Sequence, residues 1–390
     1  PAMGFYLNTK GNQKENAATG RQPDENYARE VMQLMTIGLV QLNADGTVKT
    51  DAAGKPLDSY TQDDVTNLAR VFTGYDLDIR TAERNAVTPL GATYTIESNA
   101  WTQRPMALTA SRHSTLAANF LGTSVAAGTA GDQALKIALD ALVAHPNTAP
   151  FISRQLIQRM VTSNPSAAYV KRVADVFVNN GAGVRGDMKS VIAAILLDNE
   201  ARSPDGLANA DFGHVREPML RLVQWARTCG VASANGSWRI GNLSSTSDGL
   251  GQSPLRSPSV FNFYRPGYVP PSTAIAGKGM VAPEFQIVTE TSVGGYINFI
   301  ARILQPGFNS RDVVAAYASE KALVLDPAAL VDRLALLFTA NQLSAATRTL
   351  IVDALSDPAV TAASTDAVKL NRITAAVLLV MACPEYLVQK

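Results

Sequence analysis

The chain has 390 residues, of which 46% are hydrophobic and 17% charged, and its formal net charge is +1. This composition is typical of a folded chain with one large domain or two closely packed domains, and it excludes a mostly disordered protein. Lysine and arginine form no clusters, so we expect no nucleic-acid partner. The longest nearly unbroken apolar run, 373–383, is shorter than the roughly 20 residues that cross a bilayer, so we expect no transmembrane segment.

Residues 1–22 combine glycines, asparagines and charged residues without an apolar period, which predicts a polar arm. Residues 23–38 have the clearest helical pattern in the chain, with Asp24 at the N-cap position. The polar face of this predicted helix comprises Glu25, Asn26, Arg29, Glu30, Gln33 and Thr36. We expect this face to be tied to the irregular insertions described below.

After this helix, the pair Asp45-Gly46 favours a tight turn and predicts a small β-ribbon near residues 40–60. The segment Thr61–Asp64 then has the spacing of a capping box, with Thr61 as N-cap, and opens an amphipathic helix that continues through Phe72.

Two long segments lack a regular period, 73–132 and 230–285, and we interpret them as ordered loop insertions. Apolar residues recur at helical spacing elsewhere, which predicts helices over 132–144, 148–161, 166–178, 187–198, 217–228, 286–304, 310–319, 327–339, 344–355 and 365–382. The predicted fold is therefore mainly α. We expect a main helical domain over 23–285 and C-terminal helices, 286–390, packed on the same core.

Acid and base candidates are few. Glu25, Glu30, His113 and His145 can carry protons, but a salt-bridge network is the commoner role of such a helix face, and we predict that Glu30 pairs with an arginine. Arg154 could supply that partner or could clamp a carboxylate or sulfate. No Cys or His pair has zinc spacing, so we expect no metal and no other cofactor. Cys229 and Cys383 either form a disulfide or remain two buried thiols.

Several short segments resemble the sequence motifs of a bacterial family catalogued as domain of unknown function 1800 (DUF1800), and they occur in the same order along the chain as in the family. They are Asn26-Tyr27-Ala28-Arg29-Glu30, Phe72–Tyr75, His145–Asn147, Phe151–Leu156, Arg216-Glu217-Pro218, Ser257–Tyr264, Ala282–Phe285 and Pro384–Val388. From these segments and the polar face of the first predicted helix we expect binding residues at Asn26, Arg29, Gln33, Arg154, Arg216, Glu217, Phe261, Asn262 and Tyr264.

The chain departs from the family pattern in two places. Family members follow the histidine that resembles His113 with Asp, Gly and Lys, where this chain has Ser114, Leu116 and Ala118. Some relatives have Glu and His where this chain has Gln33 and Met35. These differences remove potential metal ligands and proton carriers, so they argue against a metal-dependent enzyme.

The resemblance also implies a location and a partner. In the family, the segment similar to Pro1–Gly4 is internal and follows a signal peptide, which implies a longer precursor and a periplasmic or extracellular protein. The resemblance also implies that genes of this family accompany genes of a second family, whose proteins have a sulfatase-like fold. We therefore expect a non-catalytic binding or assembly partner of such a protein. The alternative is a hydrolase that acts on a cell-envelope or extracellular polymer through Glu and His acid/base groups, and the sequence leaves open whether the protein is an enzyme.

Overall fold

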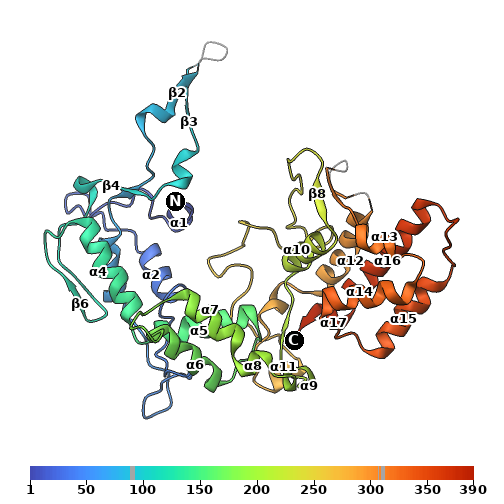
Figure 1. Ribbon diagram of the computed structural model, residues 1–390. Helices are drawn as coiled ribbons and strands as arrows, with labels where there is room; N and C mark the ends of the chain where they lie inside the picture. Colours follow the sequence, from blue (N-terminus) through green and yellow to red (C-terminus); the bar gives the residue numbers. More distant parts are fainter. Residues whose placement is uncertain (88–92, 306, 309–311) are drawn as a thin grey trace. The chain divides into compact units, whose positions relative to one another are not determined.

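The computed structural model describes residues 1–87, 93–305, 307–308 and 312–390. The fold is mainly α, with small two-stranded antiparallel sheets (Figure 1), as the sequence predicts. The chain forms two compact units. Unit 1 comprises Pro1–Leu156 and Pro165–Asp198, and unit 2 comprises Ile157–Asn164 and Asn199–Lys390. This division differs from the predicted one, because residues 23–285 are shared between the units and 286–390 lie entirely in unit 2.

Unit 1 contains a helical core and short antiparallel strand pairs. Its helices are α1 (Ala2–Tyr6), α2 (Asn26–Gln33), α3 (Gln62–Val71), α4 (Gly131–Ala144), α6 (Ala167–Val178), α7 (Met188–Leu197) and most of α5 (Thr148–Met160). Its strand pairs are β1 (Tyr75–Asp76) with β4 (Ala107–Leu108), β2 (Arg84–Val87) with β3 (Tyr94–Glu97), and β5 (Ala118–Phe120) with β6 (Thr123–Val125). In its described residues, the insertion 73–132 therefore contains these three strand pairs and single 3-10 turns, and the segment 1–22 includes α1.

The core of unit 1 lies between α2, α3, α4 and the β5–β6 hairpin. Ala28 and Met32 of α2, Leu68 of α3 and Ala138 of α4 are fully buried in one hydrophobic cluster. The predicted capping box of α3 is present, with Thr61 accepting from the Asp64 N–H and the Asp64 side chain accepting from the Thr61 N–H. The ribbon near 40–60 is also present as antiparallel bridges, including Leu42 to Val48.

Helix α2 is shorter than predicted, because it ends at Gln33 while the helical pattern continues to Gly38. The N–H groups of Ile37 and Gly38 both donate to the Met32 carbonyl in a turn. Gly38 has a φ of +74°, and a Cβ there would lie 2.6 Å from the Phe151 ring. The close approach of α5 thus requires a glycine in a left-handed turn, which a continued helix would not allow.

Unit 2 contains the remaining elements. Its helices are α8 (Asn199–Arg202), α9 (Asp205–Ala208), α10 (Pro218–Thr228), α11 (Ala274–Gly277), α12 (Glu290–Leu304), α13 (Ala318–Ala322), α14 (Pro327–Thr339), α15 (Ala345–Ser356), α16 (Asp366–Ala382) and α17 (Pro384–Leu387), with a 3-10 turn η5 (Pro283–Gln286). Strand β7 (His214–Val215) pairs with β10 (Val388–Gln389), and β8 (Val231–Ser233) pairs with β9 (Val313–Ala315).

The predicted helix over 310–319 is wrong in its described part, because β9 occupies 313–315 and α13 begins only at Ala318. The β-branched residues Val313 and Val314 pair with β8, which decides the local structure against the helical period.

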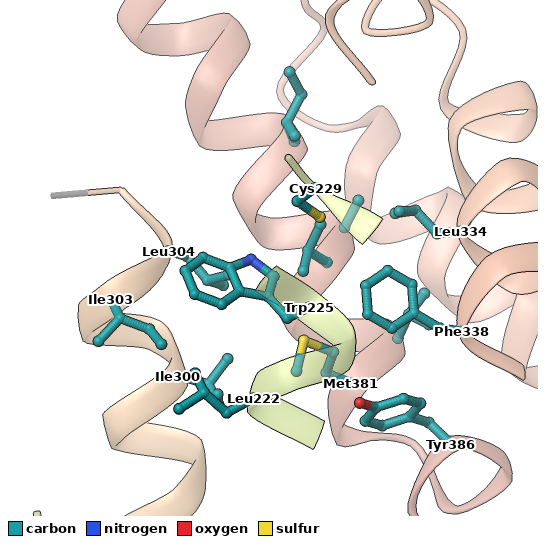
Figure 2. Close-up of a cluster of buried hydrophobic side chains, with 14 of the residues drawn as sticks. Leu222, Trp225, Cys229, Ile300, Ile303, Leu304, Leu334, Phe338, Met381 and Tyr386 are labelled. Carbon is teal, nitrogen blue, oxygen red and sulfur yellow. The ribbon is translucent and has the colours of Figure 1, made fainter. Parts of the chain in front are cut away.

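The core of unit 2 surrounds Trp225 of α10, which is completely buried. Figure 2 shows the indole among residues of α12 and α14, with Met381 and Tyr386 nearby. Its Nε1–H donates to the Tyr317 hydroxyl at 3.2 Å. Cys229 belongs to the same cluster, and both cysteines are buried free thiols. The C-terminal helices therefore share their core with α10.

Candidate functional site

The polar face of α2 is held by α3. Glu25 accepts hydrogen bonds from Arg29 at 3.1 Å, from Gln62 at 2.8 Å and from the Thr66 hydroxyl at 2.7 Å. Arg29 also donates to the Gln62 side-chain oxygen at 3.1 Å. The ion pair of Glu25 with Arg29 fits the salt-bridge network expected of this face. The side-chain bonds of Glu25 and Arg29 lead to α3, and not to the insertion 73–132 as expected.

Glu30 contradicts its prediction. Only 9% of its surface is exposed, and within the described ranges its Oε2 has no hydrogen-bond partner and the carboxylate has no ion pair. Burial raises the pKa of Glu30, and the charge of Arg29 offsets part of this effect. Arg154 does not reach it: its side chain is exposed and lies 3.9 Å from the position a Cβ of Gly46 would take.

The remaining α2 candidates are less distinctive. Asn26 and Gln33 are half-buried, and the Asn26 N–H donates to the Asp24 carboxylate at 2.8 Å. This bond explains why Asp24 looks like an N-cap in the sequence, although the N-cap position belongs to Glu25.

The two predicted histidines both have structural partners. His113 is buried, and its Nδ1 lies 3.0 Å from the Thr73 carbonyl oxygen. His145 accepts from the Asn147 N–H at 3.2 Å, and burial together with the charge of Arg185 lowers its pKa. Neither imidazole has a carboxylate within ion-pair distance among the described residues.

In unit 2, four segments far apart in sequence converge on one polar cluster, which we call the Glu217 cluster: Arg159, Glu217, Gln252 and Tyr264. Arg159 lies 3.7 Å from the Glu217 carboxylate, and its guanidinium stacks 4.0 Å from the centroid of the Tyr264 ring. The Gln252 amide donates to Glu217 and accepts from the Met219 N–H at 3.0 Å. Tyr264 is 1% exposed, and burial raises its pKa strongly.

A second feature of unit 2 is a buried pair, His214 and Glu284. His214 Nδ1 lies 3.5 Å from Glu284 Oε1, and each side chain is 2% exposed. Both ring nitrogens of His214 and Oε2 of Glu284 have no hydrogen-bond partner in the part of the chain that the structure describes. Buried polar groups without partners are rare in folded proteins and mark strained or functional positions.

The other predicted binding residues of unit 2 lie apart from this pair. Asn262 is exposed in a turn with a φ of +66°, and Phe261 stacks with Arg265 at 4.7 Å. Arg216 extends toward the C-terminal segment, where its Nη1 donates to the Tyr386 carbonyl at 2.9 Å. It lines a pocket of about 530 Å³ formed by α10, the end of α14 and residues 385–390.

Sequence reasoning missed Gln252 and Glu284, and Arg159 and His214 are not among the predicted site residues. A signal for two of them exists, because Glu284 lies inside the motif Ala282–Phe285 and His214 precedes Arg216 by two residues. Their proximity could not be predicted, since it depends on how the segments fold together.

Two negative findings apply to the described ranges. No group of three or more His, Cys, Asp or Glu side chains is arranged to hold a metal ion. No helix there combines the length and the hydropathy that crossing a bilayer requires.

Comparison with known proteins places the chain in one family. The family model described as "Protein of unknown function (DUF1800)" matches residues 1–388. No curated protein and no solved structure matches. The match contains every motif quoted above, from Asn26–Glu30 to Pro384–Val388, and so the chain belongs to the DUF1800 family.

Proposed function

We propose that this protein is an exported, periplasmic or extracellular binding or assembly protein that acts without catalysis and associates with a sulfatase-like companion. The observation that carries the proposal is a group of exposed apolar side chains around the Arg216 pocket. Leu220 is 44%, Leu336 56%, Leu337 37% and Val388 36% exposed, and all four line the pocket. Clustered apolar groups in water are unfavourable, and such clusters are typical of protein interaction surfaces.

The polar contacts of unit 1 support the same proposal. Of the four acid/base candidates, Glu25 is used in bonds to α2 and α3, and His113 and His145 contact backbone groups. Groups held in this way stabilise the fold and are poorly placed to transfer protons to a substrate.

The test uses the purified companion. The immobilised wild-type chain should retain the companion on a column. Leu336→Asp should weaken retention at least tenfold, because it places a charge in the apolar rim of the pocket, which is formed by Leu220, Leu336, Leu337 and Val388. Leu350→Asp is the matched control, since Leu350 is 71% exposed in the same unit but lies outside the pocket lining. Equal retention by both variants, or none by the wild type, would refute the proposal.

One observation favours a second candidate function, a hydrolase acting on an envelope polymer. A carboxylate beside one nitrogen of an imidazole can orient the ring so that the other nitrogen acts as a general base. Glu284 lies beside Nδ1 of His214 in this way, so Nε2 of His214 would be the base. The test is cleavage of isolated cell-wall polymer, measured as new chain ends. Cleavage that is lost in Glu284→Gln but retained in Glu25→Gln would support this function over the first. No release of chain ends by the wild type would exclude it for that polymer.

A further inference from the structure

The side chain of Arg216 is held rigidly in the pocket that it lines. Its Nη1 donates to the carbonyl oxygens of Tyr386 at 2.9 Å and Phe338 at 3.3 Å, and its guanidinium stacks 4.5 Å from the centroid of the Tyr386 ring. Nε and Nη2 have no partner among the described residues. These two nitrogens form one edge of the guanidinium, which is the edge that binds a carboxylate through two parallel hydrogen bonds.

The charge of the pocket favours an anion. Arg227 also lines it, is exposed, and has no ion pair among the residues that the structure describes. Lys390 lines it too and donates to the carbonyl oxygens of Leu207 and Asn209. The acidic residue of the lining is Glu385, whose Oε1 is already bound by the Ser344 N–H and the Thr347 hydroxyl. The lining thus contains three cationic residues and one acidic residue, which gives it an excess of positive formal charge.

The apolar rim narrows the choice of anion. A free inorganic ion would use the arginines but would leave Leu220, Leu336, Leu337 and Val388 in water. An acidic side chain flanked by apolar side chains satisfies both parts of the pocket, since its carboxylate meets the cations while its neighbours cover the rim. The volume of about 530 Å³ is that of a site for a ligand of drug-like size, which suits two or three side chains of a peptide.

We propose that the Arg216 pocket binds a glutamate or aspartate flanked by leucine-like residues in a segment of the partner protein. This inference rests on the proposed function, whose binding surface it specifies. Arg216 provides the paired hydrogen bonds, Arg227 adds charge at the edge, and the apolar rim selects a peptide over a small anion.

The probe is the acetylated tripeptide amide leucine-glutamate-leucine, with its glutamine counterpart as the ligand control, titrated calorimetrically into the full chain. The glutamate peptide should bind about tenfold more tightly than the glutamine peptide, because only the carboxylate forms charge-assisted hydrogen bonds with Arg216; tenfold corresponds to about 1.4 kcal/mol. Added salt should weaken its binding. Equal binding of the two peptides would overturn the inference.

Variants locate the site. Arg216→Gln should lose at least tenfold in affinity for the glutamate peptide and Arg227→Gln about threefold, whereas Arg21→Gln, at an exposed arginine of unit 1, should bind as the wild type does. Arg216→Gln also loses the bonds to Tyr386 and Phe338, so Arg227→Gln and Leu336→Asp report on the site even if that variant unfolds. Wild-type affinity in both Arg227→Gln and Leu336→Asp would overturn the inference.

Two further measurements separate the possible failures. Sodium sulfate that binds as tightly as the glutamate peptide would show that the rim contributes nothing, and the inference would fall. If the companion binds the wild type but the peptide does not, the inference fails while the proposed function stands. If the peptide binds at Arg216 and the companion does not bind at all, the proposed function fails and the peptide site remains.

Discussion

Glu30 carries an energetic cost that its neighbours do not share. Glu25, five residues earlier, receives three side-chain hydrogen bonds, whereas Glu30 is buried and its Oε2 has none in the described part of the chain. Burial takes this carboxylate out of water and disfavours its charged form, and this is the physical cause of its raised pKa.

This raised pKa predicts a pH-dependent stability. Because the native pKa of Glu30 exceeds the unfolded value of 4.5, the native state binds the proton more tightly. Its contribution to stability is therefore complete below the unfolded pKa and is lost as the pH rises through the native pKa. Glu30→Gln removes this loss and should stabilise unit 1 at about pH 8 by on the order of 1 kcal/mol, with little change at about pH 4.

Thermal denaturation followed by circular dichroism at both pH values tests this expectation. Glu25→Gln is the control, since it breaks bonds that Glu25 makes and should destabilise at about pH 8. Destabilisation by Glu30→Gln at about pH 8 would contradict this expectation, because it would show that a partner stabilises the ionised carboxylate.

At the scale of single elements, the sequence predicts those parts that depend on near neighbours. The capping box of α3 was predictable because Thr61 and Asp64 are three residues apart and bind each other's backbone. The end of α2 was not, because it depends on Phe151, which approaches Gly38 from another helix. For the same reason the segment 313–315 has a helical pattern but pairs with β8.

The capping box also connects α3 to the insertion 73–132. The Asp64 carboxylate accepts from the backbone N–H groups of Thr61 and Leu121, both at 2.7 Å. Burial tends to raise the pKa of Asp64, but these bonds outweigh that effect and leave the pKa lowered. The cap is therefore part of the contact between α3 and the β5–β6 hairpin.

Thr61→Ala should destabilise α3 by about 1–2 kcal/mol, because it removes the acceptor of the capping box. Thr365→Ala is the matched control in unit 2, where Thr365 accepts from Val368 at 3.4 Å and caps α16. Amide exchange should increase in α3 and in the β5–β6 hairpin for the first variant, and only near the start of α16 for the second. If amide exchange in the β5–β6 hairpin is unchanged in Thr61→Ala, the cap does not contribute to the contact between α3 and the hairpin.

Across the whole molecule, the sequence predicts the class of the fold better than its division into units. Helical periods and the spread of apolar residues indicate a mainly α protein, but they do not show which helices share a core. The Glu217 cluster illustrates the limit, because Arg159, Glu217 and Tyr264 come from segments about 50 residues apart. Motifs identify such segments, and only the fold shows that their side chains meet.

The two hydrophobic clusters predict that core substitutions act locally. Leu68 is completely buried in the cluster of unit 1 and Leu334 in that of unit 2. Leu68→Ala and Leu334→Ala each remove a buried side chain of the same type, so each should cost about 2–5 kcal/mol.

Because the clusters share no residue, the cost should appear in one unit at a time. Hydrogen exchange measured by mass spectrometry should show faster exchange in α2, α3 and α4 for Leu68→Ala, with α12, α14 and α16 unchanged, and the reverse for Leu334→Ala. Helix α5 is the informative exception, since it runs from unit 1 into unit 2 at Leu156 and Ile157. Exchange in its first part should become faster in Leu68→Ala, and exchange in its last turn should become faster in Leu334→Ala. Faster exchange throughout the chain in either variant would mean that the two units unfold as a single cooperative body.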